Sequence, residues 1–385
     1  MTEPFRLLLD PVVVRAIGAH LQRVMPAFER ERFESQALSG LDELELKARA
    51  MQIADALETA LPAAFADGAA VVVAALAPVI DGEDLGSLQT GPEGLAGWAL
   101  WPLGEWVARR GLDDPQRALQ SLHALTQRFT AEWAIRPLLL RHPALVFATL
   151  RRWCDDPSPH VRRLVSEGSR PRLPWGLQLR PLIADPTPTL PLLAALQDDP
   201  SPYVRRSVAN HLNDIAKDHP AVVADWLQRH LPEASAERRA LLRHASRSLI
   251  KAGDAAVLAA WGQGAALEGR AALAVTPAQI TLGERVGLSA TLTSLSRRPQ
   301  ALVVDYVVHH VKANGSTSPK VFKGWSLTLA PGETRTLVKQ HAVRPITTRV
   351  YYPGAHRVDL QVNGAVLASA VFDLRVPGAV SPAAG

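Results

Sequence analysis

Apolar residues recur at helical spacing along most of the chain and tend to alternate along its last quarter. Up to about residue 268 the chain is rich in Leu, Ala and Arg, with apolar positions three and four residues apart. After it come short β-branched segments separated by turn signals. The pattern predicts a helical domain at 1–268, a β domain at 269–377 and a disordered tail at 378–385.

The predicted strands have the size and rhythm of an immunoglobulin-like sandwich. About seven short strands fall within roughly 105 residues, which is typical of that fold. The strands read from the sequence are 285–295, 301–311, 325–330, 334–343, 356–364 and 365–376, and the turns between them are NGS, APGE, YPG and NG. The single cysteine, Cys154, excludes an internal disulfide and fits a reducing compartment.

The helical part repeats itself. DDPSPHVRR at 155–163 returns 43 residues further on as DDPSPYVRR at 198–206. Three units, 142–171, 185–220 and 219–254, each contain a proline-led helix, a turn and a second helix, and 113–143 fits more loosely. Two helices in about 40 residues predict a HEAT-like solenoid, whose second helices commonly line the concave face. The expected fold class is therefore a HEAT-like helical solenoid followed by a β-sandwich.

The faces of the second helices place acidic residues together. In 203–217, the apolar stripe consists of Val204, Val208, Leu212 and Ile215, and the opposite face carries Arg206, Asn210, Asp214 and Lys217. In the preceding unit, Val161, Leu164 and Val165 are predicted to be buried, whereas Arg163, Ser166, Glu167 and Arg170 face away. The repeat register sets Glu167 level with Asn210, and Glu132 in FTAEWAIRP lies at a comparable point. Three acids are thus expected to converge on one exposed, arginine-lined groove.

Charge is distributed unevenly. Residues 1–100 hold 7 Lys and Arg against 15 Asp and Glu, 101–271 hold 23 against 17, and 272–385 hold 12 against 5. The two basic segments favour a polyanion as partner, although ordinary solvated charge is the alternative. Acids in a groove that binds phosphate must serve a positive group. An alkylated base is cationic, and breaking its glycosidic bond makes an oxocarbenium-like sugar, so carboxylates there would stabilise charge and orient water.

The runs TAEWAIRP, SEGSRPRLPWG and SVANHLNDIAKDHP resemble the AlkC branch of the AlkC/AlkD-type HEAT-like-repeat DNA glycosylases, which remove 3-methyladenine and related cationic lesions. The resemblance covers essentially the whole chain, because part of that branch carries an immunoglobulin-like domain after the repeats. It implies that Glu132, Glu167 and Asp214 are the catalytic acids, that bent duplex DNA lies in the concave face, and that no deep base pocket is needed. A monofunctional glycosylase without a cofactor is expected.

Basic and aromatic residues supply the predicted DNA contacts. Those in the helical domain are Arg163, Arg170, Trp175, Arg206, Asn210, Lys217 and Arg239, and those in the β domain, which is expected to clamp the duplex, are Lys312, Lys320, Lys323, Arg344 and Arg349. Trp175, after a helix end, is the tryptophan expected to reach DNA, whereas Trp133, Trp153 and Trp226 fit the core better. The β domain has an alternative role as an appendage that only stabilises the array.

Other interpretations remain for the acids. Glu132 could pair with Arg136, Glu167 with Arg163 or Arg170, and Asp214 with Lys217, as ordinary pairs along a helix. The whole chain could then be a non-catalytic scaffold for nucleic acid or an acidic protein.

Further chemistry is not predicted. His211, Asp214 and His219 match no standard metal spacing, Cys154 has no base implied beside it, and no GxGxxG or P-loop pattern occurs. The most apolar run, 69–80, is shorter than the ~20 residues of a membrane span. We expect a monomeric, cytoplasmic, nucleoid-associated protein without metal or cofactor.

Overall fold

The computed structural model describes residues 5–80, 88–263, 265–346 and 349–377, and the predicted tail at 378–385 lies outside them. The chain forms two compact units, one of Met1–Asp218 with Ala236–Leu241 and one of His219–Ser235 with Leu242–Gly385. The boundary suggested by composition was 268. In the structure the last helices are grouped with the sandwich instead.

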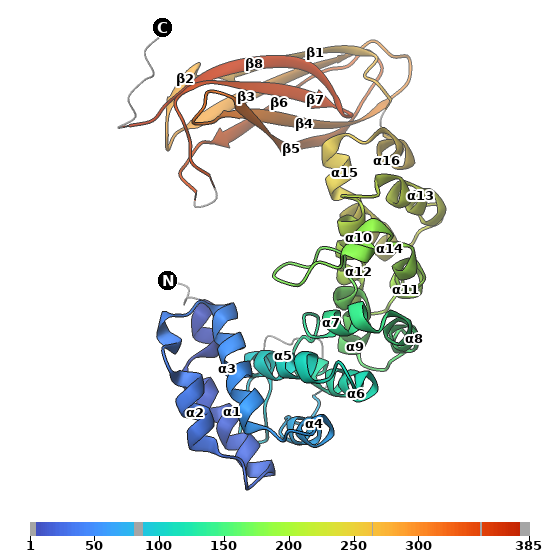
Figure 1. Ribbon diagram of the computed structural model, residues 1–385. Coiled ribbons are helices and arrows are strands. Elements are labelled where there is room, and N and C mark those ends of the chain that lie inside the picture. The colour runs from blue at the N-terminus through green and yellow to red at the C-terminus, as the bar shows by residue number, and fades with distance from the viewer. Residues whose placement is uncertain (1–4, 81–87, 264, 347–348, 378–385) are drawn as a thin grey trace. The chain divides into compact units, whose positions relative to one another are not determined.

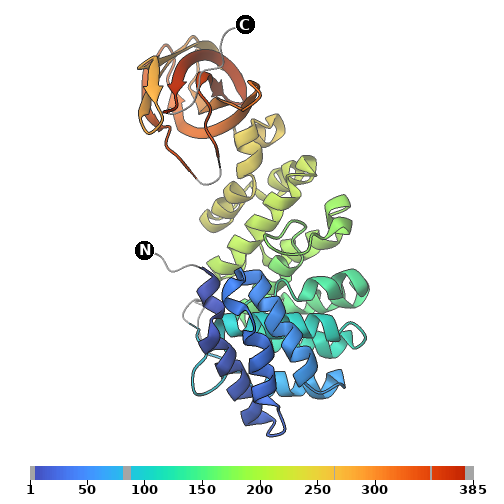
Figure 2. The same cartoon turned by 60° about the vertical axis from the view of Figure 1, so that its left-hand side comes forward.

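The first unit is built from helices. Its α-helices are α1 (Pro11–Val24), α2 (Arg30–Leu38), α3 (Leu46–Ala60), α4 (Phe65–Ala74), α5 (Leu100–Arg110), α6 (Pro115–Thr126), α7 (Ile135–Arg141), α8 (Pro143–Trp153), α9 (Pro159–Gly168), α10 (Arg180–Ala184), α11 (Leu190–Leu196) and α12 (Pro202–Ile215). Short 3₁₀ turns are η1 (Phe5–Leu9), η2 (Leu41–Glu43), η4 (Gly97–Ala99) and η5 (Thr187–Thr189). Helices α1, α2 and α3 lie side by side (Figure 2). Each predicted repeat contains its two helices.

The repeated DDPSP sequence forms the same turn in both copies. The carboxylate of Asp156 accepts the Ser158 amide at 2.8 Å, and that of Asp199 accepts the Ser201 amide at 2.9 Å. A proline then begins each helix, where its missing N–H costs nothing. The first arginine of each RR pair holds its own turn, because Arg162 donates to the Asp156 carbonyl at 2.7 Å and Arg205 does the same for Asp199.

Arg162 also ties one repeat to the next. Its guanidinium meets both carboxylate oxygens of Asp199, at 2.6 and 3.1 Å, and the Asp199 side chain is almost fully buried. This bidentate pair fixes the spacing of neighbouring turns. Helix α9 therefore packs against α12, and the second helices of the two repeats present adjacent faces.

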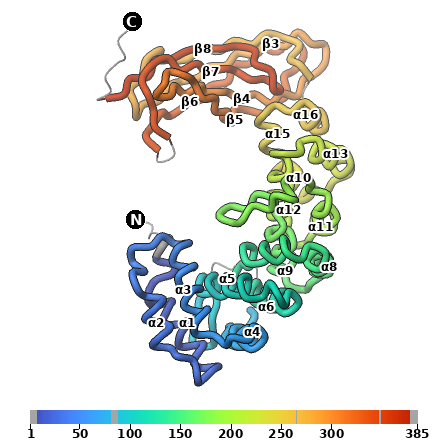
Figure 3. Tube along the Cα trace, viewed as in Figure 1, coloured from blue at the N-terminus to red at the C-terminus, as the bar shows by residue number. Residues whose placement is uncertain are grey.

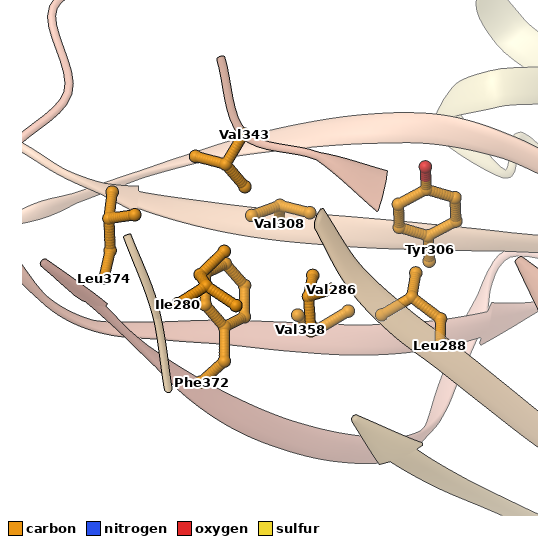
Figure 4. Packing of buried hydrophobic residues seen from close by; sticks show 9 residues of the cluster. All are labelled: Ile280, Val286, Leu288, Tyr306, Val308, Val343, Val358, Phe372 and Leu374. Carbon is orange, nitrogen blue, oxygen red and sulfur yellow. The ribbon is translucent and has the colours of Figure 1, made fainter. Parts of the chain in front are cut away.

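The second unit carries the remaining helices and the sandwich. They are α13 (Pro220–His230), α15 (Arg247–Ala252) and α16 (Ala255–Ala260), with α14 (Ala236–Ala245) shared between the units, and strands β1 (Gly269–Thr276), β2 (Gln279–Thr281), β3 (Arg285–Ser294), β4 (Gln300–Val311), β5 (Thr317–Leu329), β6 (Thr334–Ala342), β7 (Gly354–Val362) and β8 (Ala365–Arg375). One sheet has the order β1-β3-β6 and the other β2-β8-β7-β4-β5. Inward-facing residues such as Val286, Val308 and Phe372 fill the space between the sheets (Figure 4). This is the predicted immunoglobulin-like architecture.

Part of this domain was not predicted from the amino-acid sequence. Strands β1 and β2 were not predicted, and β5 begins at Thr317, whereas the predicted strand began at 325. Pro319 argues against a strand, because proline is excluded from central strands. Proline is tolerated at an edge, and β5 is an edge strand. The real turns use Asn-Gly pairs. Gly315 has φ 76°, and Asn363 and Gly364 have φ 46° and 86° between β7 and β8.

Candidate active site

Glu132 is held by an arginine from the next repeat. It lies in the turn before α7 rather than within a helix, and its side chain is 9 % exposed. Arg163 on α9 donates from Nη1 to Glu132 Oε2 at 2.6 Å and to the Thr130 hydroxyl at 3.0 Å, and that hydroxyl also donates to Glu132. The predicted partner Arg136 donates elsewhere, to the Gly168 carbonyl at 3.0 Å.

Glu167 on α9 has three partners, two that donate hydrogen bonds and one that forms a longer ion pair. Arg170 Nη1 lies 2.5 Å from its Oε1, Arg163 Nη2 lies 3.7 Å from the same oxygen, and the Ser207 hydroxyl donates to Oε2 at 2.5 Å. Burial alone would raise the pKa of Glu167, but the two guanidiniums and the Ser207 hydrogen bond outweigh burial, so its pKa lies below the usual range. Glu167 is therefore a carboxylate at neutral pH.

Asp214 on α12 completes the row. Its Oδ2 accepts from Arg170 Nε at 2.8 Å and its Oδ1 from Lys217 Nζ at 2.9 Å. Arg170 thus joins Glu167 to Asp214, as Arg163 joins Glu132 to Glu167. The five residues Glu132, Arg163, Glu167, Arg170 and Asp214 form a continuous chain of alternating charge, which we call the acid row.

The acid row is buried, and the expectation of an exposed face was wrong on this point. Glu167 and Asp214 retain 6 % and 2 % of their accessible surface, and Arg170 retains 8 %. Periodicity correctly sets them opposite the apolar stripe, but α9 and α12 pack against each other, and their facing sides exclude water. In such surroundings charges interact more strongly than at an open surface.

The alternative of ordinary helix pairs holds in part. Glu167 pairs with Arg163 and Arg170, and Asp214 with Lys217, at the predicted spacings. The same arginines also form ion pairs between repeats, Arg163 with Glu132 and Arg170 with Asp214. The local pairs alone would not bring the three acids together.

Arg136 supports the acid row from inside. It is fully buried and donates to the carbonyls of Gly168 and Leu177. Burial, together with the nearby Arg170 charge, lowers its pKa to about 10, so it remains a cation at neutral pH. Arg136 thereby fixes the end of α9 and the loop that follows it.

That loop, between α9 and α10, stands out from the helices and carries Trp175 (Figures 1 and 3). Its backbone is anchored, because Trp133 Nε1 donates to the Pro174 carbonyl at 3.3 Å and Lys47 donates to the Trp175 carbonyl at 3.2 Å. Trp175 is 60 % exposed and adopts a left-handed φ of 61°, which a non-glycine residue seldom does. The structure therefore presents the indole to solvent, and its contact with DNA stays a prediction.

The other three tryptophans, which were predicted to lie in the core, are buried to different extents. Trp226 is buried, whereas Trp133 and Trp153 are half-buried. Trp133 stacks on Trp101 with ring centroids 4.5 Å apart.

Of the remaining predicted contacts in the first unit, Arg206 and Arg239 are exposed and Asn210 is half-buried. Arg163 and Arg170 lie inside the acid row, with 17 % and 9 % of their side chains exposed, because the carboxylates hold them there. Lys217 is the most open of the basic side chains that touch the acids, at 47 %.

In the sandwich, Lys312, Lys320, Lys323 and Arg344 are exposed and Arg349 is half-buried. Lys320 lies over the ring of Phe322 at 5.6 Å and Arg349 over Tyr351 at 6.0 Å. Cations beside aromatic rings can contact both phosphate and exposed bases.

Two residues of the site, Ser207 and Tyr203, were not predicted from the sequence. Ser207 occupies the repeat position of Leu164, in the buried stripe, and its hydroxyl meets Glu167. The replacement of leucine by serine between two copies of a repeat was the signal that could have revealed it. Tyr203 lies under Arg163, with the guanidinium carbon 5.0 Å from the ring centroid, and burial raises its pKa to about 12.

Two other residues considered for chemistry, His211 and Cys154, are buried in the helical part of the chain. Burial lowers the pKa of His211 to about 4, and its Nδ1 meets the Ser166 carbonyl at 3.0 Å. Cys154 is buried, which raises its pKa to about 11. Across the described residues no group of three His, Cys, Asp or Glu side chains is arranged to hold a metal ion.

In the described ranges, no single helix has the length and apolar composition of a membrane span. Helices α3 and α4, bent by 119°, pass that test only when they are taken together.

Comparisons with known proteins agree with this architecture. Residues 270–376 match the family described as "Uncharacterised protein YhaZ, C-terminal Ig-like domain". The uncharacterised protein YhaZ of Bacillus subtilis is 35 % identical over 361 residues, which is 92 % of this chain and 95 % of YhaZ. The alkylpurine DNA glycosylase AlkC of Pseudomonas fluorescens, solved bound to DNA containing an abasic site analog, is 37 % identical, with a TM-score of 0.86 over 97 % of this chain and 99 % of that one.

Helical repeats followed by an immunoglobulin-like sandwich define an AlkC-like fold. The chain belongs to the AlkC/YhaZ family.

Proposed function

We propose that this protein is a DNA glycosylase that hydrolyses the N-glycosidic bond of cationic alkylated bases, 3-methyladenine and its relatives, in duplex DNA. The observation that carries the proposal is the acid row, in which carboxylates from a turn, α9 and α12 are assembled across repeats. The likeness to an alkylpurine DNA glycosylase over nearly the whole chain supports it.

Hydrolysis of the N-glycosidic bond of a cationic base does not require a general acid. When the bond between the sugar C1′ and the base breaks, the bonding electrons leave with the base and neutralise its positive charge. Positive charge then develops on the deoxyribose, and a water molecule adds at C1′ and loses its proton. Carboxylates fixed near that carbon stabilise the developing charge and orient the water.

Fixing the carboxylates is the role of the arginines. Arg163 and Arg170 hold the acids at set positions, and Ser207 holds the second oxygen of Glu167. A site organised before the substrate binds need not rearrange as charge develops.

DNA is held, in this proposal, by the exposed arginines Arg206 and Arg239 and by Trp175. The basic side chains of the sandwich bind the same duplex. Their contact is then intramolecular and gains from a high effective concentration. The protein acts as a cytoplasmic, nucleoid-associated monomer without a cofactor.

The test is the release of methylated purines from DNA treated with a methylating agent, resolved by chromatography. The proposal expects the wild-type protein to release 3-methyladenine and to leave abasic sites in equal number. A Glu167→Gln/Asp214→Asn double variant, checked for folding by circular dichroism, is the control. If the wild-type protein releases no more base than this control, the proposal is rejected.

A non-catalytic scaffold is the second candidate. The observation in its favour is that each of the three acids already has a cationic partner, as structural ion pairs do. A scaffold binds alkylated and unmodified duplexes equally and releases no base, so the same assay separates the two functions.

A further inference from the structure

The two oxygens of Asp214 have partners of different kinds. Oδ2 is held by Arg170 Nε at 2.8 Å, and Arg170 is itself buried and bound to Glu167 at 2.5 Å. Oδ1 is held by Lys217 Nζ at 2.9 Å. The Lys217 side chain is 47 % exposed, whereas that of Asp214 is 3 % exposed.

Only one of these two partners can leave easily. Moving Arg170 would strand two carboxylates in a buried site, which is costly. Lys217 lies just after the end of α12, and its flexible stem can carry the ammonium into water. Departure costs less for Lys217 than for Arg170, because the ammonium regains water while Arg170 still holds Oδ2 of Asp214.

We propose that Lys217 occupies, in the DNA-free protein, the place of the positive charge that develops on the deoxyribose during base release. The inference rests on the proposed function. Lys217 is a resident counter-ion of Asp214. It holds the carboxylate in position between reactions, and the substrate's own positive charge displaces it.

Removing Lys217 has opposite effects if Lys217 is a displaceable counter-ion and if it only supports Asp214. If Lys217 merely held Asp214 in place, removing it would weaken the site and slow base release. If Lys217 competes with the substrate's charge, removing it leaves Asp214 Oδ1 open to that charge. Affinity for a positively charged sugar analogue then rises, and base release is at least as fast.

The test uses full-length protein and two duplexes of one sequence, one with a cationic pyrrolidine abasic analogue and one with the neutral tetrahydrofuran analogue. Binding is measured at about 0.3 M salt, where an exposed lysine–phosphate contact is largely screened. Lys217→Met is expected to raise the preference for the cationic duplex by about threefold to tenfold, and Lys217→Arg to leave it near the wild-type value.

Arg172→Met is the matched control. Arg172 is a nearby cation paired with Asp218, at 2.7 and 2.8 Å, and not with Asp214. This substitution removes a nearby positive charge and is expected to leave the ratio of the two affinities unchanged. Lys217→Gln provides a second, polar replacement, and thermal unfolding verifies that each variant is folded.

The outcomes are distinct. A raised preference in Lys217→Met and Lys217→Gln, with single-turnover release of 3-methyladenine no slower than in the wild type, supports the inference. An unchanged or lower preference, or slower release, overturns it and leaves Lys217 as a support for Asp214. Failure of the wild type to release base overturns the proposed function, and the inference with it.

Discussion

Arg163 donates a hydrogen bond to Glu132 at 2.6 Å, although the two residues are 31 positions apart and belong to different repeats. The hydrogen bond exists because the repeats pack side by side. It turns a basic residue that could bind phosphate into one that organises an acid.

Replacing Arg163 tests this role. Arg163→Ala removes the cation that pairs with the buried Glu132 and leaves the Thr130 hydroxyl as a donor to it, so we expect the protein to lose about 3 kcal/mol of unfolding free energy. Base release at saturating DNA should fall more than about tenfold, because the acid is no longer fixed. Urea unfolding and single-turnover assays measure the two effects. If Arg163 were instead a phosphate contact, the variant would release base at the full rate once saturated.

Exposed arginines should behave differently. Arg206→Ala and Arg239→Ala are expected to weaken binding to damaged and undamaged duplexes alike and to reduce the slope of log affinity against log salt by roughly one each. Arg238→Ala is a suitable control, because Arg238 is half-buried, unlike the two exposed arginines, and donates from Nε to Asp198 at 2.7 Å. A titration series from low to moderate salt gives the slopes. Unchanged slopes in both variants would show that these side chains do not reach DNA.

The sandwich can be tested through its charges. Changing Lys312, Lys320 and Lys323 together to glutamine should lower duplex affinity and reduce the salt slope by up to about three, roughly one for each phosphate that is no longer neutralised. Arg335→Gln is the control, since Arg335 is paired with Glu333 at 2.7 Å. Ending the chain at 268 is a poorer test, because α13, α15 and α16 belong to the same compact unit as the sheets. Full affinity in the triple variant would favour the alternative of a stabilising appendage.

Buried histidines predict a stability that depends on pH. Burial lowers the pKa of His310 to about 3 and that of His341 to about 4, with Arg349 adding to both shifts. In the unfolded chain a histidine titrates near 6.5, so below that pH the unfolded state binds more protons and the folded state loses stability. Each histidine should shift the folding equilibrium by about tenfold per pH unit between about 6.5 and its folded pKa.

The measurement is urea unfolding of the wild type and His310→Phe at pH 7 and pH 5. The phenylalanine variant should lose clearly less stability on acidification than the wild type, because one of the titrating groups is gone. Its neighbours Phe322 and Tyr351 are aromatic and accept a ring at this position. Parallel losses in the two proteins would mean that His310 is not the group responsible.

The sequence revealed the repeats and the sandwich because both rest on local patterns. Apolar spacing identifies α9 and α12, and Asn-Gly turns mark the sandwich. The site was predicted only in outline. Helix periodicity sets Glu167 and Asp214 opposite the apolar stripe, but it contains no information on the neighbouring repeat that buries them. Contacts such as Arg163 to Glu132 and Ser207 to Glu167 arise between repeats, so they required the structure.

The most direct test of the account is single-turnover release of 3-methyladenine by Glu167→Gln and Asp214→Asn, measured beside their affinity for the same duplex. Both variants keep side-chain size and remove one negative charge. We predict that release falls by roughly 10² or more while DNA affinity stays unchanged or rises slightly, because an anion has left a site that binds a polyanion. Glu132→Gln should behave similarly. Equal losses of release and affinity, or release at the wild-type rate, would contradict the claim that the acid row stabilises the transition state.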